Sequence, residues 1–539
     1  MRFAAAAAAA AAALVATAAR SGNGPDSEAA GASGLTPYAD GGQFPLSEQQ
    51  QRRPLGYEQE RGPEFVREEE EGEQVGGGGR GEGPRRETRR RRPNIVVVLT
   101  DDQDAALGSL EHMPRARRHL IERGTLFSRH YATTAVCCPS RVSLWTGRLA
   151  HNTNVTDVSP PYGGYPKFIS QGFNDNYLPV WLQEAGYNTY YTGKLFNAHT
   201  VDNWNSPHPR GFTSSDFLLD PHTYDYLNST FQRDDEPPRS YEGQYSTDVL
   251  ADKAYNLLEA GIRGVESDGK PFFLVAAPIA PHANVKMGIN SGAPGAAADL
   301  GSVLFTEPVP AERHKHLFPD ARVPRTANFN PEEPSGANWV LALPRQNETN
   351  VEYNDHFYRQ RLRSLQAVDE LVEGLVTRLA DGGVLDDTYI FYTSDNGYHI
   401  GQHRLQPGKT CGYEEDVNVP LLVRGPGVAA NYSTAAAVAD GNGDDRGEGL
   451  VTTHVDLVPT FFELLGLPPR DDFDGAAIPV TRAAIEEAKK AEERREHAGI
   501  EYWGFAMGEG IYNREHQCLF ANRLTTAAAF WLSPLSPYL

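Results

Sequence analysis

The feature that most limits the fold of this chain is the run Asn94–Leu99, which is unbroken in its apolar residues from Ile95 onward and mostly β-branched. Such a strand has apolar side chains on both faces, so it must lie inside a sheet that is covered on both sides. Similar runs alternate with predicted helices. The predicted strands span 94–99, 187–192, 271–277, 389–393 and 421–424, and the predicted helices span 113–123, 178–186, 248–258, 362–379, 454–465 and 481–497. This alternation predicts an α/β fold.

Polar residues directly follow four of the predicted strands. In sheets of this kind the chemistry lies beyond the carboxyl ends of the strands. The rule selects Thr100-Asp101-Asp102, Gly193-Lys194, Pro278–His282 and Ser394-Asp395-Asn396.

The two acidic loops in this group suit a hard metal ion. Asp101 and Asp102 offer carboxylates, and Asp395 and Asn396 offer a carboxylate and an amide oxygen. An all-oxygen set favours calcium or magnesium over zinc. Either pair alone is more simply read as a helix cap, but two pairs at strand ends of one sheet favour a metal.

The four cysteines form neither a disulfide framework nor a zinc-type CxxC pattern. Cys137 and Cys138 are adjacent and cannot easily pair with each other. Cys411 and Cys518 are compatible with a disulfide in an exported protein or with free thiols, and their spacing does not decide between the two.

The segment Cys137-Cys138-Pro139-Ser140-Arg141, followed by Thr146-Gly147, resembles the signature of the type I sulfatases. The closest resemblance is to algal and fungal arylsulfatases and to glucosamine-6-sulfatases, and it covers roughly 93–475. It implies an alkaline-phosphatase-like fold, in which a large mixed sheet is sandwiched by helices, with a smaller C-terminal α+β subdomain. Further similar segments are Asn94–Asp102, Thr393–Gly397, Gly408-Lys409 and Val455–Thr460.

The resemblance also implies a reaction. A formylglycine-generating enzyme would oxidise Cys137 to formylglycine, and one hydroxyl of the hydrated aldehyde would attack the sulfur of a sulfate ester. The alcohol or phenol would leave, and the second hydroxyl would then expel inorganic sulfate. A divalent cation helps such a hydroxyl to ionise.

Each site residue receives a role by the same resemblance. The ligands of one Ca²⁺ would be Asp101, Asp102, Asp395, Asn396 and the modified Cys137. Arg141 would stabilise the hydrate, Lys194 and Lys409 would neutralise the sulfate oxygens, and His282 would protonate the leaving oxygen.

One position departs from the pattern of many arylsulfatases, in which a histidine lies two residues after the first lysine. Here that residue is Phe196, followed by Asn197. His399 or His403 could replace the missing group, and a supporting or substrate-facing position is an equal alternative. Lys194, His282, His399 and Lys409 are the expected substrate-binding residues.

The chain begins with a targeting pattern. Arg2 precedes an alanine-rich run, which predicts a signal peptide over 1–20. The sequence contains four glycosylation acceptors, at Asn154, Asn228, Asn347 and Asn431. Together they favour secretion to the extracellular space, periplasm or cell wall, with a lysosome-like compartment as an alternative.

Composition adds the remaining expectations. Residues 21–92 contain few large apolar side chains and are predicted to be disordered. The net charge of −21 argues against nucleic acid and anionic membrane as partners, and no later apolar run is long enough to span a membrane. The expected domains are a catalytic domain at 93–440 and a C-terminal subdomain at 441–539, whose end after about Phe520 departs from the family pattern and suggests an incomplete terminus.

The sequence therefore predicts an arylsulfatase-like hydrolase. A carbohydrate sulfatase such as N-acetylglucosamine-6-sulfatase is the near alternative. A phosphatase or phosphonate hydrolase on the same fold, or an inactive extracellular matrix glycoprotein, is more distant.

Overall fold

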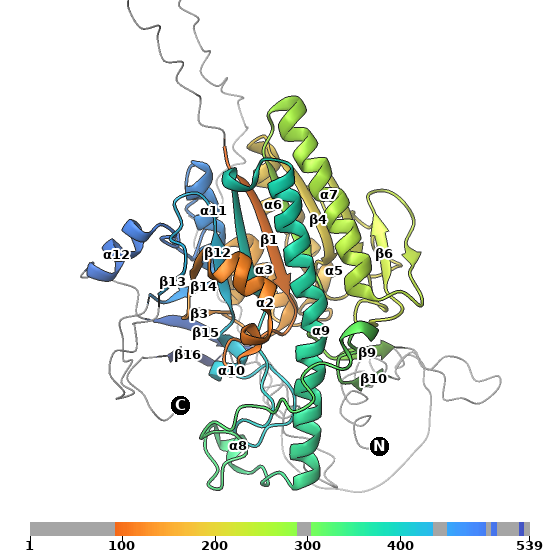
Figure 1. The fold of residues 1–539 in the computed structure, drawn as a ribbon, viewed down its shortest axis with the longest axis vertical. Helices are drawn as coiled ribbons and strands as arrows, with labels where there is room; N and C mark the ends of the chain where they lie inside the picture. The colour runs from red at the N-terminus through yellow and green to blue at the C-terminus, as the bar shows by residue number, and fades with distance from the viewer. Residues whose placement is uncertain (1–91, 288–302, 435–449, 492–496, 504–527, 533–539) are drawn as a thin grey trace, which may run out of the picture. The chain divides into compact units, whose positions relative to one another are not determined.

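The structure is a computed structural model that describes residues 92–287, 303–434, 450–491 and 497–503, together with the backbone of 528–532. Within these residues the main sheet has ten strands (Figure 1). Their order across the sheet is β13 (Tyr432–Ser433), β2 (Thr125–Leu126), β12 (Leu421–Arg424), β11 (Thr388–Ser394), β1 (Asn94–Thr100), β8 (Phe272–Ala277), β4 (Asn188–Lys194), β5 (Ser214–Leu218), β6 (Thr230–Arg233) and β7 (Arg239–Ser240).

The sheet is mixed, as expected. Strands β11, β1, β8, β4 and β5 run parallel to one another, and β12 and β6 flank them in antiparallel orientation. Strand β1 lies at the centre, where Val97 pairs with Phe391 on one side and Val275 on the other. All seven residues of β1 are buried, which confirms the reading of its apolar run.

Helices cover both faces of the sheet (Figure 1). The side chains of Ile95, Val97 and Leu99 belong to one core, and those of Val96 and Val98 belong to the other. The first core contains residues of α3 (Cys137–Thr146), α5 (Gly164–Ser170), α6 (Leu178–Glu184), α11 (Leu457–Leu465) and α12 (Arg482–Lys490). The second contains residues of α2 (Pro114–Ala116), α7 (Ser246–Asp268) and α9 (Glu348–Asp381).

Several predicted helices have different bounds in the structure. Helix α7 continues to Asp268, and α9 begins at Glu348, where the side chain of Asn347 accepts a hydrogen bond from Asn350 N at 2.9 Å. The first half of α9 lacks the expected apolar repeat because it packs on loop residues such as Tyr398 and Ile400 and not on the sheet. The charged helix predicted over 481–497 ends at Lys490, and Ala491 is extended.

A separate 3₁₀ turn at Ser109–His112 precedes the helix predicted over 113–123. That helix is largely confirmed, because α2 continues directly into a π-helical stretch at Arg117–Ile121. It ends before Gly124, where an added Cβ would lie 2.3 Å from the carbonyl oxygen of Val423. Close approach of the chain to β12 therefore replaces the last predicted turn.

Helix α3 was not predicted. All ten of its residues are buried. No face of the helix is exposed to solvent, so its sequence lacks the amphipathic repeat that predicts a surface helix. The short strands β5, β6 and β7 were also missed.

The described residues from Leu450 onward contribute to the main core and to small sheets. Phe461 of α11 packs edge-on against Phe273 of β8 and Phe391 of β11. Short strands β3 (His130–Tyr131) and β14 (Thr452–Thr453) pair, as do β15 (Ala498–Tyr502) and β16 (Ala528–Leu532). The remaining two-stranded sheet joins β9 (Asn284–Met287) and β10 (Val303–Thr306).

Among the described helices, none combines the length and hydropathy that a membrane span requires. The predicted signal peptide at 1–20 and almost all of the segment predicted to be disordered, 21–92, lie outside the described residues.

Candidate active site

The strand order brings the four predicted polar segments together. Strands β11, β1, β8 and β4 are consecutive neighbours and run in the same direction, so their carboxyl ends lie side by side. The backbone N of Asp102 donates to Asp395 Oδ1 at 3.1 Å, and that of Asp101 donates to the carbonyl of Ala280 at 3.4 Å. The positional rule thus selected segments that share one site.

Helix α3 adds the fifth segment. Cys137 is its first residue, after the extended Val136, and its Sγ lies 3.7 Å from Asp101 Oδ1. One turn later, Ser140 donates to the carbonyl oxygen of Asp395 and contacts His454 Nδ1 at 3.0 Å. These bonds fix the start of α3 to the second acidic loop. The positive end of the helix dipole therefore faces the site.

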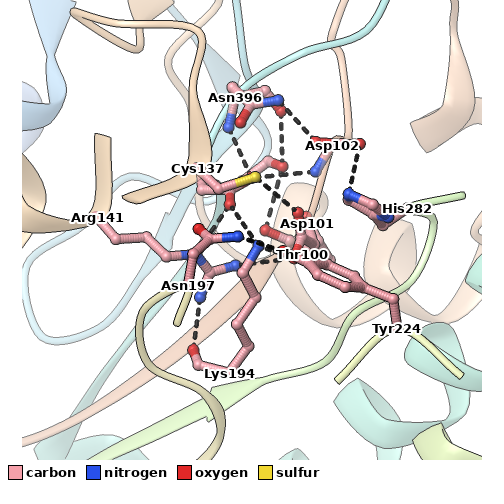
Figure 2. A network of polar contacts seen from close by, with 12 residues as sticks. Thr100, Asp101, Asp102, Cys137, Arg141, Lys194, Asn197, Tyr224, His282 and Asn396 are labelled. Carbon is pink, nitrogen blue, oxygen red and sulfur yellow. Dashed lines mark hydrogen bonds and ion pairs between the residues drawn. The ribbon is translucent and has the colours of Figure 1, made fainter. Parts of the chain in front are cut away.

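Three lysine or arginine cations pair with three carboxylates around Cys137, and Figure 2 labels Lys194, Arg141, Asp101 and Asp102 among them. Lys194 Nζ lies 2.5 Å from Asp101 Oδ2, and Arg141 Nε lies 2.8 Å from Asp395 Oδ2. Lys409 Nζ, from the loop after β11, lies 2.5 Å from Asp102 Oδ1 and 2.7 Å from Cys137 Sγ. The formal charges of these six groups cancel.

Burial and charge oppose each other in the pKa values of this group. Burial alone raises the pKa of Asp101, but Lys194, His282 and Arg141 outweigh it, so the pKa lies below its usual value. The pKa of Asp102 is likewise lowered, with Lys409 as the main cation that opposes burial. Burial raises the pKa of the Cys137 thiol to about 12 despite the neighbouring lysines, so the unmodified side chain is a neutral thiol.

The two acidic loops fit a divalent cation. Asp102 is held in the left-handed region at φ 68°, a conformation that costs energy for a residue other than glycine. The amide nitrogen of Asn396 donates to Asp102 Oδ1 at 2.8 Å and to the Gly397 carbonyl at 2.8 Å, which leaves its Oδ1 as the available atom. Among the described residues, neither Asn396 Oδ1 nor Asp102 Oδ2 has a hydrogen-bond partner, although both are buried.

Unpartnered buried oxygens are costly, and hard cations prefer oxygen ligands of this type. Asp101, Asp102, Cys137 and His282 also offer ligand atoms within 4.8 Å of one another. The structure is therefore compatible with a cation held by Asp101, Asp102, Asp395 and Asn396, and their assignment as ligands stays a prediction.

His282, in the loop after β8, lies next to Asp102. Its Nδ1 is 2.7 Å from the carbonyl oxygen of Ala283, which can only accept, so Nδ1 carries a proton. Its Nε2 is 3.6 Å from Asp102 Oδ2 and is the nitrogen that can exchange a proton inside the site. Burial lowers the pKa of His282, and Asp102 and Asp101 partly oppose that shift.

The other two predicted histidines, His399 and His403, contact different residues. His399 is buried, with its Nδ1 2.7 Å from Asp416 Oδ1, and its backbone forms a bridge with Gly408, next to Lys409. His403 stacks on Tyr413 with ring centroids 4.0 Å apart. Neither is labelled in the network of Figure 2. Their role in substrate binding or in hydrate breakdown stays a prediction.

Phe196, which replaces the histidine of the family pattern, packs in the core against Phe168 with ring centroids 4.5 Å apart. Cys411 is buried near His399 and Asp416. Its suggested partner Cys518 lies outside the described residues, so their pairing stays untested.

The sequence reasoning missed two groups that complete the site. Arg361 of α9 donates to the carbonyl oxygen of Asp102 at 2.5 Å and to Asp104 Oδ1 at 3.1 Å. Its only sequence signal is its spacing of four and seven residues from Leu365 and Val368, which places a charge on the apolar face of α9. Tyr224, which contacts both His282 and Lys194, had no signal of this kind.

The glycosylation acceptors lie at the surface to different degrees. Asn154, Asn347 and Asn431 are exposed, and Asn228 is half-buried. Glycosylation of these residues stays a prediction.

The family model described as Sulfatase matches residues 93–467. An arylsulfatase of Volvox carteri is 43% identical over 373 residues, which are 68% of this chain and 54% of that protein. The N-acetylglucosamine-6-sulfatase of Homo sapiens is 32% identical over 395 residues, which are 72% of this chain and 64% of that protein. The chain thus spans between about half and two thirds of the length of these curated relatives.

A solved structure of a protein in complex with its substrate, D-glucosamine-2-N,6-O-disulfate, has the same fold. Its TM-score is 0.59 at 23% sequence identity, over 77% of this chain and 84% of that chain. The match and the observed sheet confirm the expected alkaline-phosphatase-like architecture.

Proposed function

Since this chain belongs to the sulfatase family, we propose that it hydrolyses sulfate esters of the arylsulfatase type and releases inorganic sulfate. The observation that carries the proposal is the position of Cys137, at the start of α3 and in contact with Lys409 and Asp101. We propose that Cys137 acts after oxidation to formylglycine.

The modified residue would supply a hydroxyl nucleophile, and a bound Ca²⁺ would supply positive charge that favours its ionised form. The residues that would hold the cation are Asp101, Asp102, Asp395 and Asn396. Cys137 is only 2% exposed. A formylglycine-generating enzyme must therefore reach it before the chain has folded.

The two lysines are suited to different tasks. Lys194 is fully buried beneath the site, between Asp101 and Asp395. The side chain of Lys409 is 16% exposed and lies against Cys137 Sγ, so it is the cation that an entering sulfate group meets first. Both would stabilise negative charge on the sulfate oxygens as the ester bond breaks.

Arg141 has a structural task in this arrangement. Its side chain is fully buried, with Nη1 2.6 Å from the Lys194 carbonyl and Nη2 3.4 Å from Asp101 Oδ2. Together with its bond to Asp395, these contacts hold the acidic loops and the Lys194 strand end at a fixed distance. A direct effect of Arg141 on the hydrate remains part of the proposal.

His282 would donate the proton that the leaving oxygen needs. Because Nδ1 is bound to the Ala283 carbonyl, the proton would come from Nε2 of the imidazolium and would move to the ester oxygen as the S–O bond breaks. Since burial lowers the pKa of His282, the imidazolium that donates this proton would form mainly at acid pH. Proton donation matters more for an alcohol than for a phenol, since a phenolate leaves more easily.

That property supports a carbohydrate sulfatase as the second candidate. A site with a fixed proton donor can release a sugar alcohol, and one relative is an N-acetylglucosamine-6-sulfatase. Turnover of a chromogenic aryl sulfate, compared with a panel of sulfated glycans, separates the two candidates. Phosphate ester turnover far above sulfate turnover would indicate the phosphatase alternative.

We also propose that the protein is exported. The support is the leader-like sequence at 1–20 and the surface position of Asn154, Asn347 and Asn431.

The decisive experiment combines mass spectrometry with one variant. In protein from the native source, the peptide that contains Cys137 is expected to carry an aldehyde, and Cys137→Ala should abolish turnover while the circular dichroism spectrum stays unchanged. Cys138→Ala is the matched control, because this neighbour packs in the hydrophobic core and should leave most activity. Substantial activity in Cys137→Ala would overturn the mechanism. An unmodified Cys137 with no turnover would favour the inactive matrix glycoprotein.

A further inference from the structure

Tyr224 lies where two groups of the proposed mechanism meet. Its ring stacks on His282 with centroids 4.1 Å apart and planes inclined by 25°, and Lys194 Nζ lies 4.8 Å from the centroid of the same ring. Tyr224 is 5% exposed and lies in the connection between β5 and β6. Figure 2 shows its ring beside both partners.

The ring is fixed from both ends. Asn197, which follows β4, donates from its side-chain nitrogen to the Tyr224 hydroxyl at 2.7 Å. The backbone N of Val285, just after the His282 loop, donates to the Tyr224 carbonyl at 3.1 Å. Tyr224 therefore ties the connection between β5 and β6 to the two loops that supply Lys194 and His282.

His282 needs such a support. One ring nitrogen is bound to the Ala283 carbonyl, but Nε2 is 3.6 Å from Asp102, beyond hydrogen-bond length. Within the part of the chain that the structure describes, the bond to the Ala283 carbonyl is the one hydrogen bond of the imidazole, so the ring can rock about it. The flat contact with Tyr224 restricts that motion, since stacked rings keep their planes nearly parallel.

We propose that Tyr224 is a positioning residue, which holds the His282 imidazole and the Lys194 ammonium in the arrangement that leaving-group protonation requires. The inference rests on the proposed function. The face of the ring does the positioning, and the hydroxyl adds a second anchor through its bond to Asn197.

The test is the dependence of rate on the leaving group. Wild type, Tyr224→Phe and Tyr224→Leu would be assayed for kcat and KM on aryl sulfates whose phenols differ in acidity. In Tyr224→Leu, kcat should fall about a hundredfold for the least acidic phenols, the size of a lost proton donation, and only a few-fold for 4-nitrophenyl sulfate, with KM nearly unchanged. Tyr224→Phe keeps the ring and should stay within about fivefold of wild type for every substrate.

Two further variants make the result specific. Asn197→Ala removes the same hydrogen bond as Tyr224→Phe and should match it. In a His282→Asn background, Tyr224→Leu should add no further leaving-group bias, because the proton donor is already absent. If Tyr224→Leu fails to fold in a thermal melt, Tyr224→Met supplies the same comparison with a side chain of more similar volume.

An equal loss for all leaving groups in Tyr224→Leu, or a bias that persists in the His282→Asn background, would overturn the positioning role. A wild-type protein that carries formylglycine and hydrolyses no sulfate ester would instead refute the proposed function.

Discussion

Lys194 and Arg141 are completely buried, and each is held against a carboxylate of an acidic loop. Burying a charge is expensive, and removal of one partner of a buried pair typically costs about 3–5 kcal/mol. The site tolerates six charges because each has an opposite charge within 4 Å. The same compensation keeps Asp101 and Asp102 ionised in the interior, as the lowering of their pKa values requires. The residues that would carry the reaction therefore also stabilise one another.

His199, three residues after Phe196, shows the opposite case of a buried group without a counter-charge. It packs on Tyr165 with centroids 4.2 Å apart, and burial lowers its pKa to about 3. An unfolded chain takes up a proton near pH 6.5, whereas the folded chain does not, so stability is lost as the pH falls below 6.5. Between pH 7 and 5 this one group should remove about 2 kcal/mol.

The measurement is the free energy of unfolding by urea at both pH values. His199→Phe should lose about 2 kcal/mol less than wild type over this interval, and the same substitution at the exposed His316 should change little. An identical pH dependence in His199→Phe and wild type would show that His199 is not the source.

Among the secondary-structure elements, β4 and β8 set the position of Lys194 by how closely they approach each other. Gly193 immediately precedes Lys194, has φ 106° and pairs with Ala277 of β8. A Cβ at Gly193 would lie 2.1 Å from the Ala277 carbonyl oxygen. The strand can therefore deliver Lys194 to Asp101 only with glycine at this position.

Gly193→Ala should destabilise the protein by about 3 kcal/mol, because it adds a backbone clash to an unfavourable φ. It should lower kcat further than its stability loss explains, since Lys194 is displaced. Gly186→Ala is the matched control before the same strand, with φ 86° and no atom within 4 Å of the added Cβ, and should cost about 1 kcal/mol. Thermal melts and kcat for both variants check this, and equal effects would contradict the close-approach argument.

At the scale of the whole molecule, the site joins segments that are far apart in the sequence. The Asp101 loop, α3, the strand end at Lys194, the His282 loop and the Asp395 loop meet at one edge of the sheet. A ligand that binds only to this assembled set stabilises the folded state, because the unfolded chain has no such site. Cation binding and global stability should therefore be linked.

Calcium at about 100 times its dissociation constant should stabilise the protein by about 2.7 kcal/mol relative to protein in EGTA. The readout is Tm by calorimetry, which does not require activity. In Asp102→Asn the calcium-dependent part of Tm should be much smaller, because one ligand charge is lost. A wild-type Tm that is the same in EGTA and in calcium would contradict a cation site in the acidic loops.

The central strand and the segments that meet at the site follow from sequence patterns alone. The run Asn94–Leu99 is apolar from Ile95 onward, so it had to be a buried central strand. Position at the end of a strand was enough to select Asp101, Lys194 and Asp395. The structure brings these segments together because neighbouring parallel strands end at the same edge of the sheet, and the roles of their residues stay predictions. The segment around Cys137 added the family, since its residue pattern is specific.

The remaining features emerge in the folded chain, because they depend on contacts between distant segments. Helix α3 is buried on all sides and has no periodic signal, and α9 begins at Glu348 because its first half packs on loops. Arg361 and Tyr224 reach the site from elements that carry no motif. For Cys137, the sequence indicated by resemblance which reaction the residue would carry out. The fold placed Lys409 and Asp101 beside its sulfur.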